Sequence, residues 1–229
     1  MHIFFVSCLY EMYNHFFKMF KLKLSQTLKE KPKEIIALSQ KLIINKDIQF
    51  YSRDPAIAEI LQRRDFDGSM HIGQGLYYFL VESNVGINKA NRLIKRQVTI
   101  DIKDNREKII INFQNDNSVP YVNYQRIYTN QDTELTDVLI GDKKVTVIDK
   151  KIFVTKAGEK FNEFGFMVGV YAQNQAKVEI NLKSSLPLES KKNIFIQKQS
   201  GLPNTNYVVN YQQQSKNLEL TSDQKLIFD

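Results

Sequence analysis

The sequence predicts a mainly β protein, an antiparallel β-sandwich of the immunoglobulin-like type that follows an N-terminal helical segment with some α/β character. Three observations support this. Apolar residues recur at helical spacing in the first third of the chain, they alternate with polar residues from about residue 75 onward, and turn residues separate roughly ten short strands. The 229 residues can bury a core without cross-links, and Cys8 has no second cysteine with which to form a disulfide.

The first third of the chain predicts two helices, at about residues 10–30 and 33–45, separated by Pro32. A short strand is expected at residues 47–51. Asp54 followed by Pro55 then provides an N-cap and a proline at the first helical position, so a third helix should begin there and end by Arg64.

Residues 65–69 contain turn residues, with Asp65 and Asp67 preceding Gly68. The same spacing resembles the start of a calcium-binding loop, but position twelve of such a loop is Leu76 instead of a glutamate. A helix-to-strand turn is the favoured interpretation. Asp65 and Asp67 remain the weak metal-ligand candidates, and no cofactor is expected.

Alternation begins after this turn, so the predicted domains are residues 1–66 and 67–229. Residues 98–102 and 109–113 predict a hairpin whose turn contains Asp104 and Asn105. Residues 164–172 carry large apolar side chains on one face, which is typical of a central strand packed on an opposing sheet. Further strands are expected at residues 122–128, 134–140, 144–148, 152–155, 178–182, 193–199 and 207–212.

Composition excludes several classes of protein. The last histidine is His71, so neither a histidine-based triad nor a histidine-rich zinc site can be built inside the sandwich. The net charge of +7 is spread over both segments, whereas nucleic-acid binding requires a concentrated basic surface, so no nucleic acid is expected. The longest apolar run, at residues 3–10, is too short to span a bilayer, although it could be a poor lipoprotein signal ending at Cys8.

The connection from Asn84 to Asn91 is the most unusual segment, because asparagines, a glycine and a lysine follow an apolar strand. Backbone N–H groups and Lys89 could bind an anion there. Asn84, Asn88, Lys89 and Asn91 are therefore the candidate binding residues. The alternative is a polar connection whose asparagines satisfy its own backbone. Tyrosines could also form a binding face, although tyrosine is ordinary on half-buried strands, at Tyr121, Tyr124, Tyr128, Tyr207 and Tyr211.

The order of segments over residues 35–215 resembles the C-terminal half of a bacterial family known as domain of unknown function 4012. The resemblance rests on the turn Phe66-Asp67-Gly68, on the pattern Asn84, Gly86, Asn88 and Lys89 after a strand, and on the late segment 193–201. It implies that residues 1–66 are the remnant of an upstream domain, one that faintly resembles the LytR-CpsA-Psr phosphotransferases. Residues 67–229 would then be the family's C-terminal β domain.

This resemblance implies an extracytoplasmic, cell-envelope protein. Together with the missing histidines, it predicts a non-catalytic module that binds a protein or glycan partner. The alternative is a truncated part of a cell-wall glycopolymer phosphotransferase, in which residues 1–66 would complete a lipid-pyrophosphate pocket. The family hallmark that would carry such an activity is missing from this sequence.

Overall fold

The computed structural model describes residues 18–70, 73–86, 89–155 and 158–229, which form two compact units. The first ends at Ile44 and the second is Asn45–Asp229. Residues 45–66 therefore belong to the same unit as the strands, although the sequence suggested a division after residue 66. No helix among the described residues is both long and apolar enough to cross a membrane.

The first unit consists of helix. Residues 18–30 are helical, and α2 (Pro32–Ile44) begins directly after residue 31. Pro32 starts α2 because a proline at the first helical position lacks only an N–H group that would have no partner there. The helices predicted at residues 10–30 and 33–45 are thus confirmed where the structure describes them, while residues 10–17 and Cys8 lie outside the described residues.

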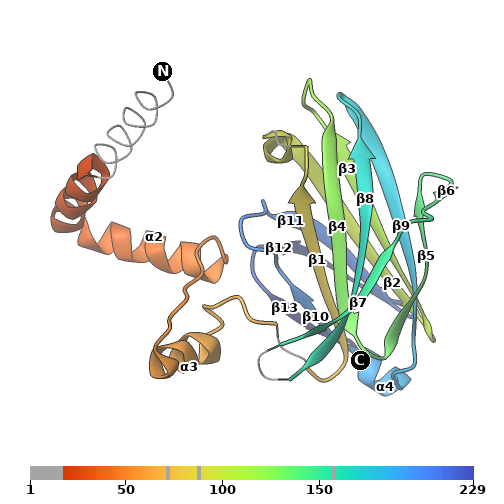
Figure 1. Ribbon diagram of the computed structural model, residues 1–229. Helices are drawn as coiled ribbons and strands as arrows, with labels where there is room; N and C mark the ends of the chain where they lie inside the picture. Colours follow the sequence, from red (N-terminus) through yellow and green to blue (C-terminus); the bar gives the residue numbers. More distant parts are fainter. Residues whose placement is uncertain (1–17, 71–72, 87–88, 156–157) are drawn as a thin grey trace. The chain divides into compact units, whose positions relative to one another are not determined.

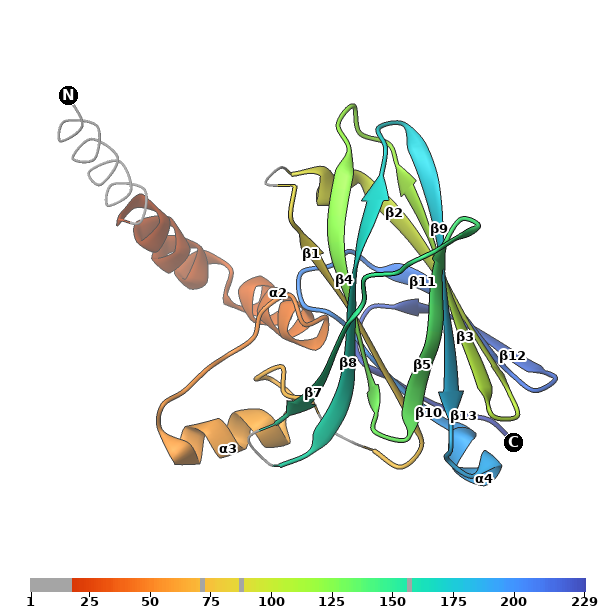
Figure 2. The same ribbon diagram turned by 45° about the vertical axis from the view of Figure 1, so that its right-hand side comes forward.

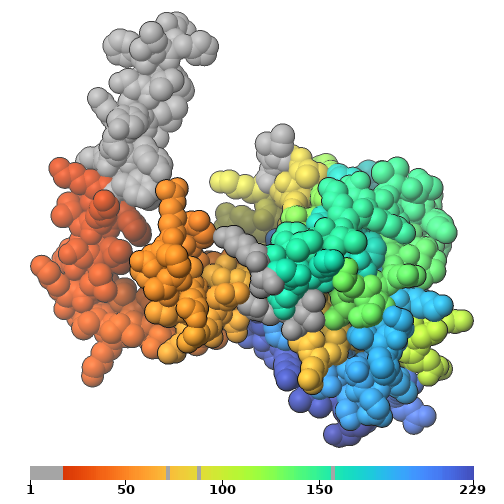
Figure 3. All heavy atoms as spheres, turned by 60° about the horizontal axis from the view of Figure 1, so that its bottom comes forward, coloured from red at the N-terminus to blue at the C-terminus, as the bar shows by residue number. Residues whose placement is uncertain are grey.

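The second unit opens with an irregular segment and α3 (Pro55–Arg63). The carboxylate of Asp54 caps α3 by accepting hydrogen bonds from the backbone N–H groups of Ala56 and Ile57, as the sequence predicted. The strand predicted at residues 47–51 is wrong. These residues pair with no strand, and Phe50 instead donates its N–H to the carbonyl of Phe66 at 2.8 Å. Figure 3 shows the segment in orange.

Two β-sheets face each other and make the sandwich (Figures 1 and 2). The six-stranded sheet has the order β13 (Gln224–Ile227), β10 (Asn193–Gln197), β1 (Leu76–Asn84), β4 (Tyr121–Asn130), β8 (Lys160–Val170), β7 (Asp149–Val154). The seven-stranded sheet has the order β12 (Gln214–Leu220), β11 (Thr205–Tyr211), β2 (Ile94–Lys103), β3 (Arg106–Asn115), β9 (Asn174–Ser184), β5 (Thr133–Ile140), β6 (Lys143–Lys144). A 3-10 helix, η1 (Ala90–Leu93), precedes β2, and α4 (Leu188–Lys191) precedes β10.

The predicted β-sandwich is confirmed, with one departure from the antiparallel expectation. β1 pairs with β10 in parallel, and β2 pairs with β11 in parallel. Both pairs join strands that are far apart in the sequence, so no hairpin turn constrains their direction. The remaining ladders are antiparallel, including the predicted β2–β3 hairpin, in which Asp104 adopts a positive φ of 54°.

Alternating side chains from the two inner faces form the core. On β8, Phe164, Phe166, Val168 and Val170 are buried on one face, which confirms the predicted central strand. Gly165, on the opposite face, is approached by the side chain of Tyr124. The core continues through the apolar faces of the strands of both sheets.

Three strands depart from the sequence-based prediction. The strand expected at residues 144–148 ends at Lys144, because the next four residues cross from one sheet to the other while Val145 and Ile148 pack against the core. β12 and β13 were not predicted. Each lies at the edge of a sheet, where fewer side chains are buried and the alternation is weak.

Candidate functional site

Three connections meet at one end of the sandwich (Figures 1 and 2). They are the predicted Asn84–Asn91 connection with η1, the turn between β3 and β4, and the turn between β8 and β9. We call this surface the loop end. Loops at the end of a sandwich are free to present side chains because the sheets beneath them carry the fold.

Side chains with amide groups tie the three connections together. Asn117 donates to the carbonyl of Ala90 at 2.9 Å, and the N–H of Gln173 donates to the carbonyl of Asn117 at 3.1 Å. The buried Asn115 donates to three carbonyls, at 3.0 Å to Val119, 3.1 Å to Val170 and 3.0 Å to Tyr171. The described parts of the three connections are therefore tied to one another by hydrogen bonds.

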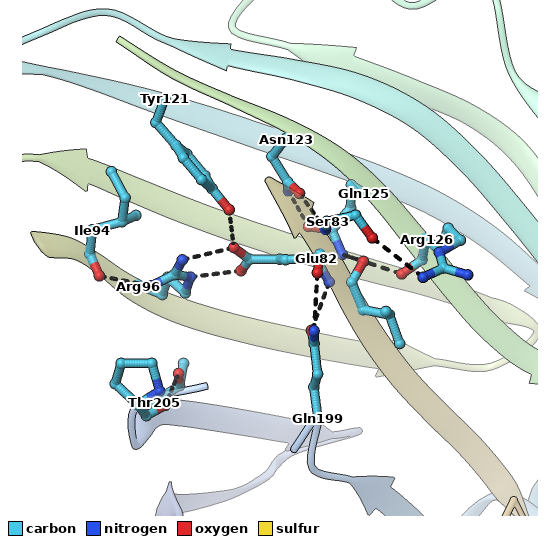
Figure 4. A network of polar contacts seen from close by, with 12 residues as sticks. Glu82, Ser83, Ile94, Arg96, Tyr121, Asn123, Gln125, Arg126, Gln199 and Thr205 are labelled. Atoms are coloured by element: carbon cyan, nitrogen blue, oxygen red, sulfur yellow. Dashed lines mark hydrogen bonds and ion pairs between the residues drawn. The ribbon is translucent and has the colours of Figure 1, made fainter. Parts of the chain in front are cut away.

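A buried ion pair closes the base of the Asn84–Asn91 connection (Figure 4). Glu82 lies on β1 just before the connection and Arg96 lies on β2 just after it. The guanidinium donates from Nε to Oε1 at 2.6 Å and from Nη2 to Oε2 at 2.7 Å, which is the two-point geometry that suits arginine and carboxylate. Tyr121 also donates to Oε2 of Glu82, at 2.6 Å. We call Glu82, Arg96 and Tyr121 the clamp.

The charges and protonation states of the clamp residues stabilise one another. The side chains of Arg96 and Glu82 are 4% and 7% exposed. Burial opposes the charge of Arg96, but the hydrogen-bonded carboxylate of Glu82 outweighs it and places the pKa of Arg96 above its ordinary value. Burial, together with the negative charge of Glu82, raises the pKa of Tyr121, which keeps its hydroxyl protonated as a donor. The clamp therefore holds the connection instead of reacting.

The structure places three of the four predicted binding residues at the loop end. Asn84 ends β1 and accepts a hydrogen bond from the N–H of Gly86 at 3.1 Å. Lys89 is exposed and precedes η1, while Asn91 is half-buried within it. Asn88 lies outside the described residues. Asn84 thus satisfies part of the connection's own backbone, and Lys89 is free to face solvent.

Buried amides surround the clamp on the inner side of the six-stranded sheet. Asn123 and Gln125 on β4 are buried, and Gln125 donates to the carbonyl of Val81 at 3.2 Å. Gln199 donates to the carbonyl of Glu82 at 2.9 Å and accepts from its N–H at 2.6 Å. The cavity among these residues measures only about 30 Å³, which is room for water and not for a substrate.

A larger cleft lies on the outer face of the six-stranded sheet, within the second unit. Its volume is about 610 Å³, inside the range of small-ligand sites. We call it the aromatic cleft. It is lined by Phe50, Tyr51, Ser52, Pro55, Ala58, Glu59, Leu61, Gln62, Asp67, Gly68, Ser69, Met70, Phe79, Phe153, Thr155 and Glu159.

The floor of the aromatic cleft is part of a layer of rings. Phe79 and Phe153 both contact Tyr128, with ring centroids 5.8 Å apart in each pair. The layer continues below, where Tyr77 contacts Phe161 at 4.8 Å. At the rim, Phe50 is 42%, Tyr51 77% and Phe153 39% exposed, so ring surface is available to a ligand.

Oxygen and amide groups supply the polar lining. Asp67 accepts a hydrogen bond from the N–H of Ser69 at 3.0 Å and another from its hydroxyl, so this carboxylate has local partners. Asp65 lies in the same turn with a positive φ of 55°. The helix-to-strand turn is thus observed. Within the described ranges no three metal-ligating side chains gather around the two aspartates.

The aromatic cleft was not apparent from the sequence, because its lining comes from three separate parts of the chain, residues 50–70, 79 and 153–159. The tyrosines considered as a binding face do not form one. Tyr121, Tyr207 and Tyr211 are buried in the core between the sheets. Tyr128 lies in the ring layer on the outer face. Tyr124 lies against Gly165 on the same face and donates its hydroxyl to Asp149 at 2.5 Å. A signal was present in Phe50 and Tyr51, two aromatic residues in a polar segment, but the sequence suggested a strand there.

Comparisons with known proteins give little to set beside this geometry. No family model matches the chain, and no curated protein matches it. A solved structure from Legionella pneumophila, a candidate nutrient binding protein, is similar with a TM-score of 0.35 and 10% identity. The match covers 59% of this chain and 54% of that one, so the chain matches about half the length of that protein.

Proposed function

We propose that this chain is a non-catalytic binding module of the cell envelope, and that the aromatic cleft binds a neutral glycan. The observation that carries the proposal is the cleft itself, with exposed rings beside hydroxyl, amide and carboxylate groups. The faces of sugar rings carry C–H groups that pack on aromatic rings, and their hydroxyls bond to such polar groups.

Charge favours a neutral ligand over an anionic one. Among the described residues that line the cleft, none is lysine, arginine or histidine, while Glu59, Asp67 and Glu159 are acidic. A lipid pyrophosphate or a phosphate-bearing polymer would bring its negative charge towards these carboxylates, and the described lining residues include no basic side chain to bind the phosphate. The geometry therefore gives no support to the glycopolymer-phosphotransferase alternative.

The envelope location rests on the sequence resemblance over residues 35–215. The same resemblance motivates the second part of the proposal, that the loop end contacts a protein or glycan partner through Lys89 and Asn91, with Asn88 beside them in the sequence. The clamp supports this part because it fixes both ends of the connection. Anchoring the two ends of a connection reduces the entropy that is lost on binding.

Calorimetry with a neutral hexamer of N-acetylglucosamine tests the cleft. We expect Tyr51→Ala and Phe153→Ala each to weaken binding about tenfold, because truncating a central aromatic contact typically costs that much. Val147→Ala is the control, since Val147 is 78% exposed, close to the 77% of Tyr51, and lines neither the cleft nor the loop end. Equal affinities for wild type, Tyr51→Ala and Phe153→Ala would contradict the assignment.

The loop end is tested separately by pull-down and glycan-array measurements on a triple variant, Asn88→Ala, Lys89→Ala and Asn91→Ala. A signal that falls in this variant while the binding in the cleft persists would support the loop end as a contact site. A signal that persists unchanged would argue against it.

A further inference from the structure

The four strands at the edges of the two sheets differ in how well they are protected. β13 has four residues, and β6 has two residues, both of them lysine. β12 is polar except for Leu218 and Leu220. β7, at the remaining edge, carries Ile152, Phe153 and Val154 in succession, 61%, 39% and 52% exposed. A long apolar edge is unusual, because edge strands are open to pairing with another chain.

The outer edge of β7 is free to pair. Within the described residues its backbone is bonded to β8 alone, in a regular antiparallel register without a bulge. All six residues of β7 are exposed and none is proline. An extended chain laid beside it could therefore form a continuous ladder of backbone hydrogen bonds, each contributing modestly.

A groove runs along the inner side of the same strand, where the sandwich is open between β7 and β5. Its volume is about 380 Å³. Its apolar lining is the exposed Ile152 together with the buried Leu135 and Phe164. Because side chains alternate along a strand, an added strand would place every second side chain in this groove.

The charged residues around the groove indicate which kind of ligand it would bind. Lys150 and Lys151 are among its lining residues, with Glu134 as the one carboxylate. The side chain of Lys150 shares the inner face with Phe164. That of Lys151 shares the outer face with Glu163, so a strand added at this edge would meet one lysine on each face. Lys151 also lies opposite Glu163 in the ladder with β8, but neither lysine forms an ion pair within the described residues. Because both lysines lack an ion-pair partner in this part of the chain, an occupant that carries carboxylates would complement their charge.

We propose that β7 and its groove bind an extended polypeptide with acidic flanks, which adds as a further strand to the six-stranded sheet. The occupant is a polypeptide because only a polypeptide offers N–H and carbonyl groups at the spacing of a strand. This surface is separate from the loop end, and it adjoins the aromatic cleft at Phe153, whose ring lies on the outer face of β7, away from the groove.

A synthetic peptide with a central Thr-Val-Thr-Val-Thr-Val and glutamates on both sides tests the proposal by fluorescence polarisation. Ile152→Lys is expected to weaken its binding about tenfold, because the new cation fills the groove beside the ladder. Asn217→Lys on the exposed edge strand β12 is the matched control and should stay within about twofold. Ile152 is exposed, so an unchanged circular dichroism spectrum will show that the variant folds.

Two modified peptides separate strand addition from plain charge attraction. A version N-methylated at all six central residues should not bind, because it cannot donate hydrogen bonds. A lysine-flanked version should bind about threefold more weakly. The proposal is overturned by no binding at about 1 mM, by equal binding of the methylated peptide, by displacement with single-stranded RNA, or by dimerisation that Ile152→Lys abolishes.

Discussion

Replacing Arg96 by methionine is the sharpest test of how the loop end is held. The guanidinium makes three hydrogen bonds, two to Glu82 at 2.6 and 2.7 Å and one from Nη1 to the carbonyl of Ile94 at 2.7 Å. Methionine keeps much of the apolar stem of arginine but is shorter and removes the charge and the hydrogen-bond donors. Glu82 would then keep the hydroxyl of Tyr121 but lose its countercharge in a site where it is 7% exposed.

The cost follows from this burial. Removing one partner of a buried ion pair typically destabilises a protein by about 3–5 kcal/mol, because the remaining charge is left uncompensated. The free energy of unfolding of a protein is commonly about 5–15 kcal/mol, so a loss of this size should be easy to measure. The double variant Glu82→Leu, Arg96→Met removes both charges and should recover most of the loss.

Urea unfolding at pH 7 measures the effect, followed by circular dichroism and by the fluorescence of the 11 tyrosines, since the chain has no tryptophan. Lys95→Met is the control. Lys95 neighbours Arg96 and pairs with Asp116 at 2.8 Å, but it is 71% exposed, so its loss should cost less than about 1 kcal/mol. Equal losses for Arg96→Met and Lys95→Met would refute the reasoning.

Three further changes have defined outcomes. Burial raises the pKa of Glu107, whose charge faces the buried Lys191 at 4.0 Å. Lys191→Met would leave the Glu107 carboxylate buried without a countercharge, and urea unfolding should show a loss of about 3 kcal/mol at pH 8. At pH 5 more of Glu107 is protonated and carries no charge, so the loss should be clearly smaller. Asn115→Asp would set a carboxylate oxygen against three carbonyls, and thermal unfolding should show a loss of about 2–3 kcal/mol. Asp54→Ala should raise hydrogen exchange at the N-terminus of α3, consistent with the loss of a cap worth about 1 kcal/mol.

Alternation in the sequence predicted the strands well where one face is deeply buried. The faces of β2, β3 and β8 alternate cleanly because each lies inside its sheet. β12 was not predicted because Leu218 and Leu220 are its only apolar residues. A strand at the edge of a sheet buries few side chains and can therefore form with so few apolar residues. The parallel pairing of β1 with β10 joins segments more than a hundred residues apart, and no local signal records such a partner.

The candidate sites also divide into those with a local sequence signal and those that depend on distant segments. The sequence singled out the Asn84–Asn91 connection by composition, and the structure places it among three tied loops. The clamp was not predicted, because Glu82 and Arg96 are residue types that are usually exposed and nothing in their neighbours marks them as buried. The aromatic cleft depends on how segments 50–70, 79 and 153–159 pack, which residue spacing alone does not reveal.

The most direct test of the binding-module proposal is a titration of the isotope-labelled protein with the neutral N-acetylglucosamine hexamer, followed by amide chemical shifts in nuclear magnetic resonance spectra. We predict saturable shifts concentrated at Tyr51, Ser69 and Phe153, which line the aromatic cleft. No shifts, or shifts confined to Lys89 and Asn91 at the loop end, would contradict the assignment of the cleft as the glycan site.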